Sequence, residues 1–304
     1  MSEQNANPLA ALSGQIQRLV QGAAGAIVGV RSHGRSVASG FAWKPGVVVT
    51  ASDALEADDD ISIVAGDKTV EAKLAGRDPT TDIAVLRVSD SLPVSAAPLT
   101  PSPEAAVGQM VVAVGRGKDG VIAALGCIAA AGGAWQSRRG GSIDRLIRLD
   151  LRLHRHAEGG LVLDAEGRAL GMPVFGPRQR PLIIPLATID LIAPKLLADG
   201  RIRRGYLGVG LHPIRLDDSI AATRGSADRR AVMVVSVDPD GPAGKAGLLL
   251  GDILLSFNGE PVSGLRNLFA RLSPESVDKP AELTLLRGGQ VTSAKLTIGA
   301  SPAS

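Results

Sequence analysis

The chain has 304 residues, with 33 Lys and Arg against 30 Asp and Glu, and a formal net charge of +3. This length allows two or three domains that each bury a core. Apolar residues make up 45% of the chain but aromatic residues only 2%, so the cores must be mainly aliphatic. The single cysteine excludes an internal disulfide. Arginines crowd residues 138–155 without interleaved aromatic side chains, so they indicate a solvated face or an acidic protein partner, and nucleic-acid binding is not expected.

The N-terminal segment, residues 1–22, starts with polar residues and lacks the basic start and apolar stretch of a secretory signal. A cytoplasmic location is therefore expected. No apolar run is long enough to predict a membrane-spanning helix. Helical spacing of the apolar side chains predicts a short amphipathic helix that packs on the following domain, or contacts a second subunit or a membrane surface; these side chains are Leu9, Leu12, Ile16, Leu19 and Val20.

Short alternating segments separated by turn residues fill 23–104 and again 105–187. Each set predicts a small antiparallel β-barrel, and two packed barrels would place a cleft at their junction. Within the second set, the alternation over 147–154 predicts one half-buried strand. Residues 188–200 predict a helix that ends at Gly200 as a C-cap.

Residues 201–300 predict a different domain, marked by three glycine-containing segments. Asn258-Gly259 adds a tight hairpin signal. Spacing of i, i+3, i+4 and i+7 defines one apolar helix face, made by Leu265, Leu268, Phe269 and Leu272. The three segments are Gly205-Tyr206-Leu207-Gly208-Val209, Pro242 to Leu248 and Gly251 to Leu254.

Three segments of the barrel region carry one acidic residue each: Asp53 in 50–55, Asp82 in 81–86 and Glu158 in 156–160. Their order and surroundings resemble the segments of HtrA (high-temperature-requirement) serine proteases that carry the general base, the orienting aspartate and the nucleophile. Residues 205–254 are similar to the PDZ domain attached to these proteases. The resemblance covers about Ser36 to Gly299.

This resemblance implies a mainly β fold. Two six-stranded antiparallel barrels of the chymotrypsin type would form a trypsin-like domain, 23–200, divided into 23–104, 105–187 and a helix over 188–200. A smaller α+β PDZ domain would follow, over 201–300.

Measured against the family pattern, only Asp82 keeps the family residue. Asp53 stands where the histidine belongs, and Glu158 stands where the serine belongs. A serine nucleophile needs a neutral imidazole and N–H donors for the oxyanion. His156 replaces the first glycine of the oxyanion loop, which we expect to reshape that loop. We therefore expect no catalytic residue of the family type.

Three carboxylates that converge in one cleft repel each other, so at least one pKa should rise or a cation should intervene. For Glu158 we expect structural compensation, with its carboxylate on remaining donors or paired with His156 or Arg155. His154, His156 and Glu158, together with Asp53, make only a weak metal pattern. Neither a metal nor a cofactor is expected.

The family's PDZ domains bind the C-termini of peptides or proteins. By this resemblance, the carboxylate loop is Tyr206, Leu207, Gly208 and Val209. Leu265, Leu268 and Phe269 would supply the facing helix, either as core residues or as pocket residues for an apolar last residue of the ligand. The family usually forms trimers through aromatic contacts near the N-terminus, but no aromatic residue precedes Phe41. The oligomeric state is therefore left open.

These observations favour a non-catalytic HtrA-like pseudoprotease that acts as an adaptor, scaffold or holdase through its PDZ groove. The alternative is a hydrolase, a peptidase that uses the acidic cleft of Asp53, Asp82 and Glu158. A second alternative is a structural subunit of a larger complex.

Overall fold

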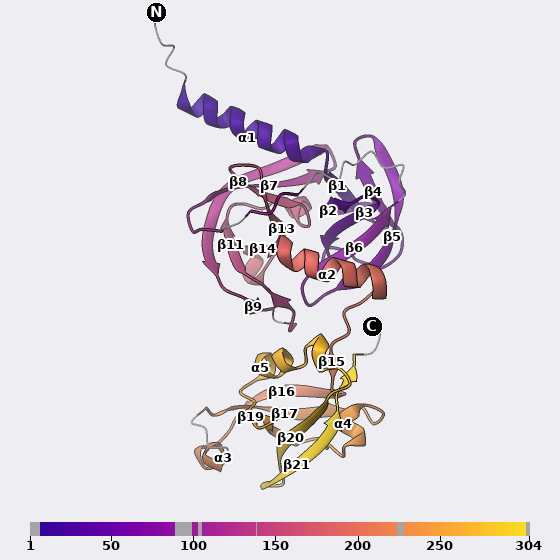
Figure 1. Cartoon of the computed structure of the whole chain (residues 1–304), viewed down its shortest axis with the longest axis vertical. Helices are drawn as coiled ribbons and strands as arrows, with labels where there is room; N and C mark the ends of the chain where they lie inside the picture. Colours follow the sequence, from indigo (N-terminus) through magenta and orange to yellow (C-terminus); the bar gives the residue numbers. More distant parts are fainter. Residues whose placement is uncertain (1–6, 89–98, 103–104, 138, 224–227, 302–304) are drawn as a thin grey trace, which may run out of the picture. The chain divides into compact units, whose positions relative to one another are not determined.

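The structure, a computed structural model, describes residues 7–88, 99–102, 105–137, 139–223 and 228–301. The chain divides into two compact units, residues 1–202 and 203–304. The first unit holds two closed antiparallel barrels and the second an open sheet with short helices (Figure 1). The expected mainly β fold with two six-stranded barrels is confirmed.

The first barrel runs in the order β1-β2-β3-β6-β5-β4, and β1 closes it against β4. Alternating apolar residues turn inward along each strand, as the period of two requires. Turn residues such as Gly34, Gly46 and Gly66, all with positive φ, separate the strands. The strands are β1 (Ile27–Ser32), β2 (Arg35–Lys44), β3 (Val47–Ala51), β4 (Ile61–Ala65), β5 (Lys68–Asp78) and β6 (Ile83–Val88).

The second barrel repeats this order, as β7-β8-β11-β14-β13-β12. A two-stranded hairpin of β9 and β10 rises between β8 and β11. An aliphatic core packs the two barrels against each other and includes Val49, Met172 and Ile184. The strands are β7 (Met110–Gly117), β8 (Gly120–Gly132), β9 (Trp135–Gln136), β10 (Ser142–Ile143), β11 (Leu146–Asp150), β12 (Leu161–Asp164), β13 (Ala169–Phe175) and β14 (Pro181–Pro185).

Helix α1 (Pro8–Ala24) starts with the Asn7 side chain accepting the N–H of Leu9, and Pro8 fits its first turn. Its later apolar residues pack on the core between the barrels, whereas Leu9 is 74% exposed. Helix α2 (Leu186–Asp199) buries one apolar face against the barrels. It ends at Gly200, which has the expected left-handed conformation with φ 73°. None of the helices in the described ranges is long and apolar enough to cross a membrane.

The strand predicted over 147–154 is shorter than expected. β11 ends at Asp150, whose pairing partner is Cys127 on β8. From Leu151 the chain leaves the barrel and enters a 3-10 turn, η1 (Arg155–Ala157). The His154 side chain starts this turn, because its Nδ1 accepts the N–H of His156. Alternation alone does not distinguish a paired strand from an extended connection.

The second unit is built on the sheet β16-β17-β18-β20-β21, with β19 paired to β18 and a small β15-β22 ladder beside it. Asn258 and Gly259 both have positive φ between β18 and β19, which confirms the hairpin signal. The elements are β15 (Gly205–Tyr206), β16 (Val209–Arg215), α3 (Asp218–Thr223), β17 (Arg230–Val237), α4 (Pro242–Lys245), β18 (Ile253–Phe257), β19 (Glu260–Pro261), α5 (Leu265–Arg271), β20 (Pro280–Arg287), β21 (Gln290–Thr297) and β22 (Gly299–Ala300). Two further 3-10 turns of the chain are η2 (Pro177–Gln179) and η3 (Pro274–Ser276).

Candidate functional site

The two acidic residues of the first barrel lie side by side. β3 and β6 are neighbours, with Ala51 opposite Ile83, so the ends of the two strands bring Asp53 and Asp82 together. The N–H of Asp53 donates to Oδ1 of Asp82 at 2.7 Å. Asp82 has φ 59°, a left-handed conformation that costs energy in a residue with a Cβ.

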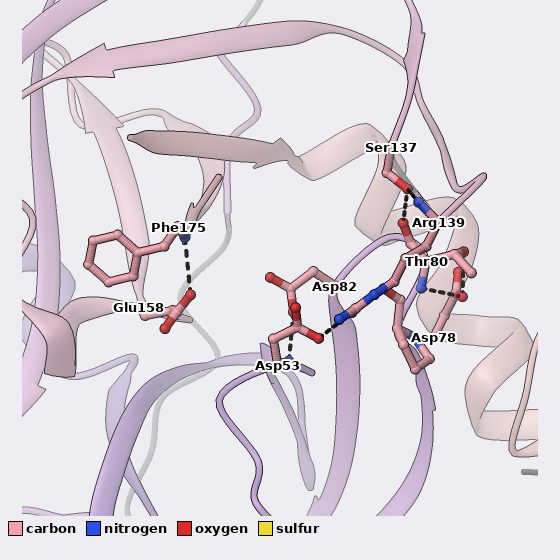
Figure 2. A network of polar contacts seen from close by, with 9 residues as sticks. Asp53, Asp78, Thr80, Asp82, Ser137, Arg139, Glu158 and Phe175 are labelled. Carbon is pink, nitrogen blue, oxygen red and sulfur yellow. Dashed lines mark hydrogen bonds and ion pairs between the residues drawn. The ribbon is translucent and has the colours of Figure 1, made fainter. Parts of the chain in front are cut away.

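A cation from the second barrel lies on this acidic pair. The hairpin of β9 and β10 places Nη1 of Arg139 at 2.5 Å from Oδ1 of Asp53 (Figure 2). The same Nη1 donates to the carbonyl oxygen of Pro79 at 3.1 Å. Ser137 fixes the hairpin to the first barrel, because its hydroxyl donates to the carbonyl oxygen of Thr80 at 2.6 Å.

Glu158 reaches the cleft from the end of η1. Its Oε1 accepts the N–H of Phe175, the last residue of β13, at 3.1 Å. Figure 2 shows this carboxylate directed to Phe175 and standing apart from the Asp53–Arg139 pair. The expected compensation on remaining donors is present. The carboxylate accepts the N–H of Phe175, and among the described residues it makes no hydrogen bond or ion pair with the side chain of His156 or Arg155.

The electrostatics show that the three carboxyl groups share one site. Burial, together with smaller contributions from the neighbouring Asp53 and Glu158, raises the pKa of Asp82 to about 7. Burial also raises the pKa of Glu158, with a contribution from Asp53. The expectation that a pKa rises or a cation intervenes is met in both ways, since Arg139 pairs with Asp53.

A cavity of about 240 Å³ lies beside the Asp53, Asp82 and Arg139 side chains, and Glu158 is not among its lining residues. Its described lining holds Asp53, Asp82 and Arg139, with hydroxyls from Thr80, Thr81 and Ser137. No imidazole is among the described residues that line it. Aromatic and aliphatic side chains form the rest, including Trp135, Ile143, Phe175 and Leu182.

The loop before Glu158 is closed on itself. The N–H of His156 donates to Nδ1 of His154 at 3.2 Å, and the N–H of Glu158 donates to the carbonyl oxygen of Arg155 at 3.3 Å. Neither His156 nor Ala157 has a positive φ. The side chain at 156 is thus accommodated by a 3-10 turn that uses the N–H groups of the loop internally.

The candidate metal pattern has little geometric support. The rings of His154 and His156 stack at 5.4 Å between centroids. Burial lowers the pKa of His156. Among the residues that the structure describes, no group of three or more His, Cys, Asp or Glu side chains could hold a metal ion.

The second unit brings part of the predicted peptide-binding set together. Gly208 has φ 77°, and a Cβ there would meet the Cα of Gly241 at 3.0 Å. The N–H groups of Leu207 and Gly208 donate no hydrogen bond to any other described residue. These two N–H groups belong to the segment 206–209, for which carboxylate binding stays a prediction.

Helix α5 lies along β16, and its residues divide into two kinds. Leu265 and Phe269 are half-buried at the margin of the core. Leu268 is fully buried, so of the two roles left open for it the structure favours packing in the core. Leu272 is also in the core, at 6% exposure. The i, i+4 pair therefore faces the edge of β16, while the i+3 and i+7 residues fill the interior.

Sequence reasoning missed Arg139 and Phe175 as cleft residues. Arg139 appeared only as one member of an arginine-rich stretch, and its neighbour Arg138 lies outside the described residues. Phe175 contributes its main chain, which leaves no trace in residue type.

Family models match both units of the chain. A trypsin-like peptidase domain matches residues 38–172, and a PDZ domain matches residues 205–298. The chain is an HtrA-type protein, a trypsin-like peptidase domain followed by one PDZ domain. The HtrA resemblance drawn from the three acidic segments is thereby confirmed.

Curated relatives of this HtrA-type chain carry protease names. A probable periplasmic serine endoprotease DegP-like of Brucella suis is 31% identical over 283 residues, covering 89% of this chain and 54% of the relative. The protein of that name in Rhizobium meliloti is 31% identical over 282 residues, covering 90% and 55%. The chain thus spans about half the length of the curated relatives it matches.

Solved structures share the fold. A serine endoprotease from Yersinia pestis has a TM-score of 0.69 at 25% identity, covering 94% of this chain and 98% of that one. The HtrA-type protease AlgW with decapeptide has a TM-score of 0.72 at 23% identity, covering 95% and 99%.

Proposed function

We propose that this HtrA-type protein binds the C-termini of peptides or proteins through its PDZ groove and lacks serine-protease activity, so that it acts as an adaptor, scaffold or holdase. The observation that carries this proposal is the arrangement around Glu158. By the family pattern Glu158 stands at the nucleophile position, and its carboxylate accepts the N–H of Phe175. The family's serine mechanism needs a hydroxyl and an imidazole within hydrogen-bond reach, and neither Asp53 nor Glu158 supplies them.

The oxyanion loop supports the same proposal. In trypsin-like proteases, two backbone N–H groups of this loop stabilise the tetrahedral intermediate. By the family pattern these belong to His156 and Glu158, and both already donate within the loop. Charge developing on a substrate carbonyl would find no free donor from this pair.

A second candidate is a peptidase that uses carboxyl groups for acid–base chemistry, and the serine endoprotease names of the relatives favour a peptidase. The pKa of Asp82 near 7, beside the Asp53–Arg139 ion pair, is the feature that would suit this chemistry. Such an enzyme would lose activity when Asp82 is changed to Asn.

A cytoplasmic location and an oligomeric state stay predictions, which cell fractionation and sedimentation would test.

One assay separates the two candidates. Casein and fluorogenic peptides are incubated with the full chain between pH 5 and 8, next to Asp82→Asn and a variant with the family residues restored, Asp53→His, His156→Gly and Glu158→Ser. We expect no cleavage by the unchanged chain and detectable cleavage only after restoration. Cleavage by the unchanged chain that Asp82→Asn abolishes would establish the peptidase instead.

Binding is measured on the same preparations. A fluorescein-labelled peptide ending in Val with a free carboxylate should bind, and the same peptide with a C-terminal amide should not. Equal binding of acid and amide would contradict C-terminal recognition.

A further inference from the structure

Strand β16 has one unpaired edge, because it is the first strand of the described sheet β16-β17-β18-β20-β21. Leu265 and Phe269 of α5 stand half-buried beside this strand. A peptide bound in the groove would add to the sheet at this edge, antiparallel to β16, with its carboxylate at the loop of Leu207 and Gly208.

The main-chain groups of neighbouring strand residues point to opposite edges. Gly208 accepts the N–H of Asp238 at 2.8 Å, and Leu216 donates to the carbonyl oxygen of Arg229 at 2.7 Å. Both bonds run toward β17, so the even-numbered residues of β16 face β17. The bulge in this pairing adds its extra residue to β17 and leaves the alternation of β16 intact.

The odd-numbered residues Val209, Leu211 and Pro213 therefore face the unpaired edge. Val209 and Leu211 each offer an N–H and a carbonyl there. Pro213 offers only a carbonyl, because its ring nitrogen carries no hydrogen. This placement is the one that a proline tolerates in a sheet, with its nitrogen directed away from the ladder.

We propose that Pro213 ends the recognition of a bound peptide, so that the PDZ unit reads about the last four residues of its ligand and gains little from longer tails. The proposal rests on the proposed PDZ function. In an antiparallel addition, the last residue of the ligand lies by Val209 and the third from the end exchanges two hydrogen bonds with Leu211. The fifth from the end lies opposite Pro213, and its carbonyl finds no donor.

The consequence is a ligand class defined by its extreme C-terminus. Many different proteins that share a short apolar ending would bind with similar affinity, since residues farther from the end add no complete hydrogen-bond pair. The exposed side chains of His212 and Pro213 add no closed pocket at that distance. An adaptor or holdase needs tolerance of this kind.

The test measures the binding of two peptides to the full chain by fluorescence anisotropy. One peptide has four residues, and the other has six residues that end in the same four. We expect their dissociation constants to agree within about twofold, since one complete hydrogen-bond pair is missing. In Pro213→Val the restored N–H should tighten the six-residue peptide by about fivefold and leave the four-residue peptide unchanged. His212→Val is the matched control, because its main chain faces β17.

Pro213→Ala repeats the measurement with a smaller side chain. An unchanged dissociation constant for the four-residue peptide shows that the groove of each variant is intact. A large preference of the unchanged chain for the longer peptide, kept in both Pro213 variants, would overturn the proposal. Equal tightening by His212→Val would overturn it as well. Failure of both peptides to bind any variant would instead contradict the PDZ function itself.

Discussion

Each of the three carboxyl groups in the cleft is stabilised by a different partner. Asp53 has the guanidinium of Arg139, Asp82 has the N–H of Asp53, and Glu158 has the N–H of Phe175. Only Asp53 is paired with a full positive charge. The other two carboxyl groups therefore retain raised pKa values, with burial as the main cause.

The raised pKa of Asp82 makes the protein less stable as the pH rises. The group changes from its usual 3.8 to about 7 on folding, so between these values the folded state binds more protons than the unfolded state. Stability must fall across that window and level off above it. Asp82→Asn imitates the protonated form and still accepts the N–H of Asp53. We expect it to raise the free energy of unfolding by about 1 kcal/mol or more at pH 8 and to change little at pH 5.

Thermal unfolding at the two pH values measures this effect. Asp164→Asn is the control, because the contribution of Asp164 to stability depends on pH in the opposite direction. Arg168 and Ser102 bind that buried carboxylate and hold its pKa below the usual value. Its stabilisation is present above the usual pKa and is lost as the pH falls through the folded one. Equal destabilisation by Asp82→Asn at pH 5 and at pH 8 would contradict this prediction.

The convergence of Asp53, Asp82 and Glu158 was predictable, since the resemblance places all three at the barrel junction. Arg139 was not, because its partner Asp53 is 86 residues away in the sequence. A hairpin between two barrels can aim a long side chain at many points. Residue type alone predicted that a cation could intervene and left its identity open.

At the scale of elements, the turn after η1 joins the two barrels. Ser39 on β2 donates its N–H to the carbonyl oxygen of Glu158 at 2.8 Å, and its hydroxyl accepts the N–H of Arg116 on β7 at 2.7 Å. Gly159 lies directly after Glu158 with φ 79°. A Cβ at Gly159 would meet the carbonyl oxygen of Ser39 and the hydroxyl of Thr50.

Gly159→Ala should therefore destabilise the first unit by about 2 kcal/mol or more, because it adds both a strained φ and a clash with main chain. Gly133→Ala is the matched control, since no atom lies within 4 Å of its added Cβ and its φ is not positive. Chemical denaturation of both variants measures the difference. Equal stability of the two would show that the turn moves freely away from β2.

Hydrophobic periodicity predicted the strands and helices well where one face of the element packs against the core or a partner strand. It overextended β11, because the apolar alternation continues through Leu151 and Leu153 after pairing stops at Asp150. It also left α5 ambiguous, since an apolar stripe does not reveal which member faces a groove. Leu268 turned inward because α5 presents that side to the sheet core.

At the scale of the whole molecule, each unit closes its own core. The barrels share an aliphatic core that reaches from Ile27 to Ile202, and the second unit buries a separate cluster around Phe257 and Leu283. Ile202 is the last residue of the first core and is only 9% exposed. Separate cores of this size predict that the first unit folds without the second.

A chain that ends after Arg203 should keep the unfolding midpoint of the barrel unit and lose binding of the C-terminal peptide. A chain that ends after Ala198 removes Gly200 and Ile202 as well. It should unfold with about 2 kcal/mol less free energy, because burial of one isoleucine side chain contributes about that amount and α2 loses its C-cap. Calorimetry of both truncations and the full chain measures these differences. Retained peptide binding by the chain ending at Arg203 would place recognition on the barrels, and equal stability of the two truncations would remove Ile202 from the core's energetics.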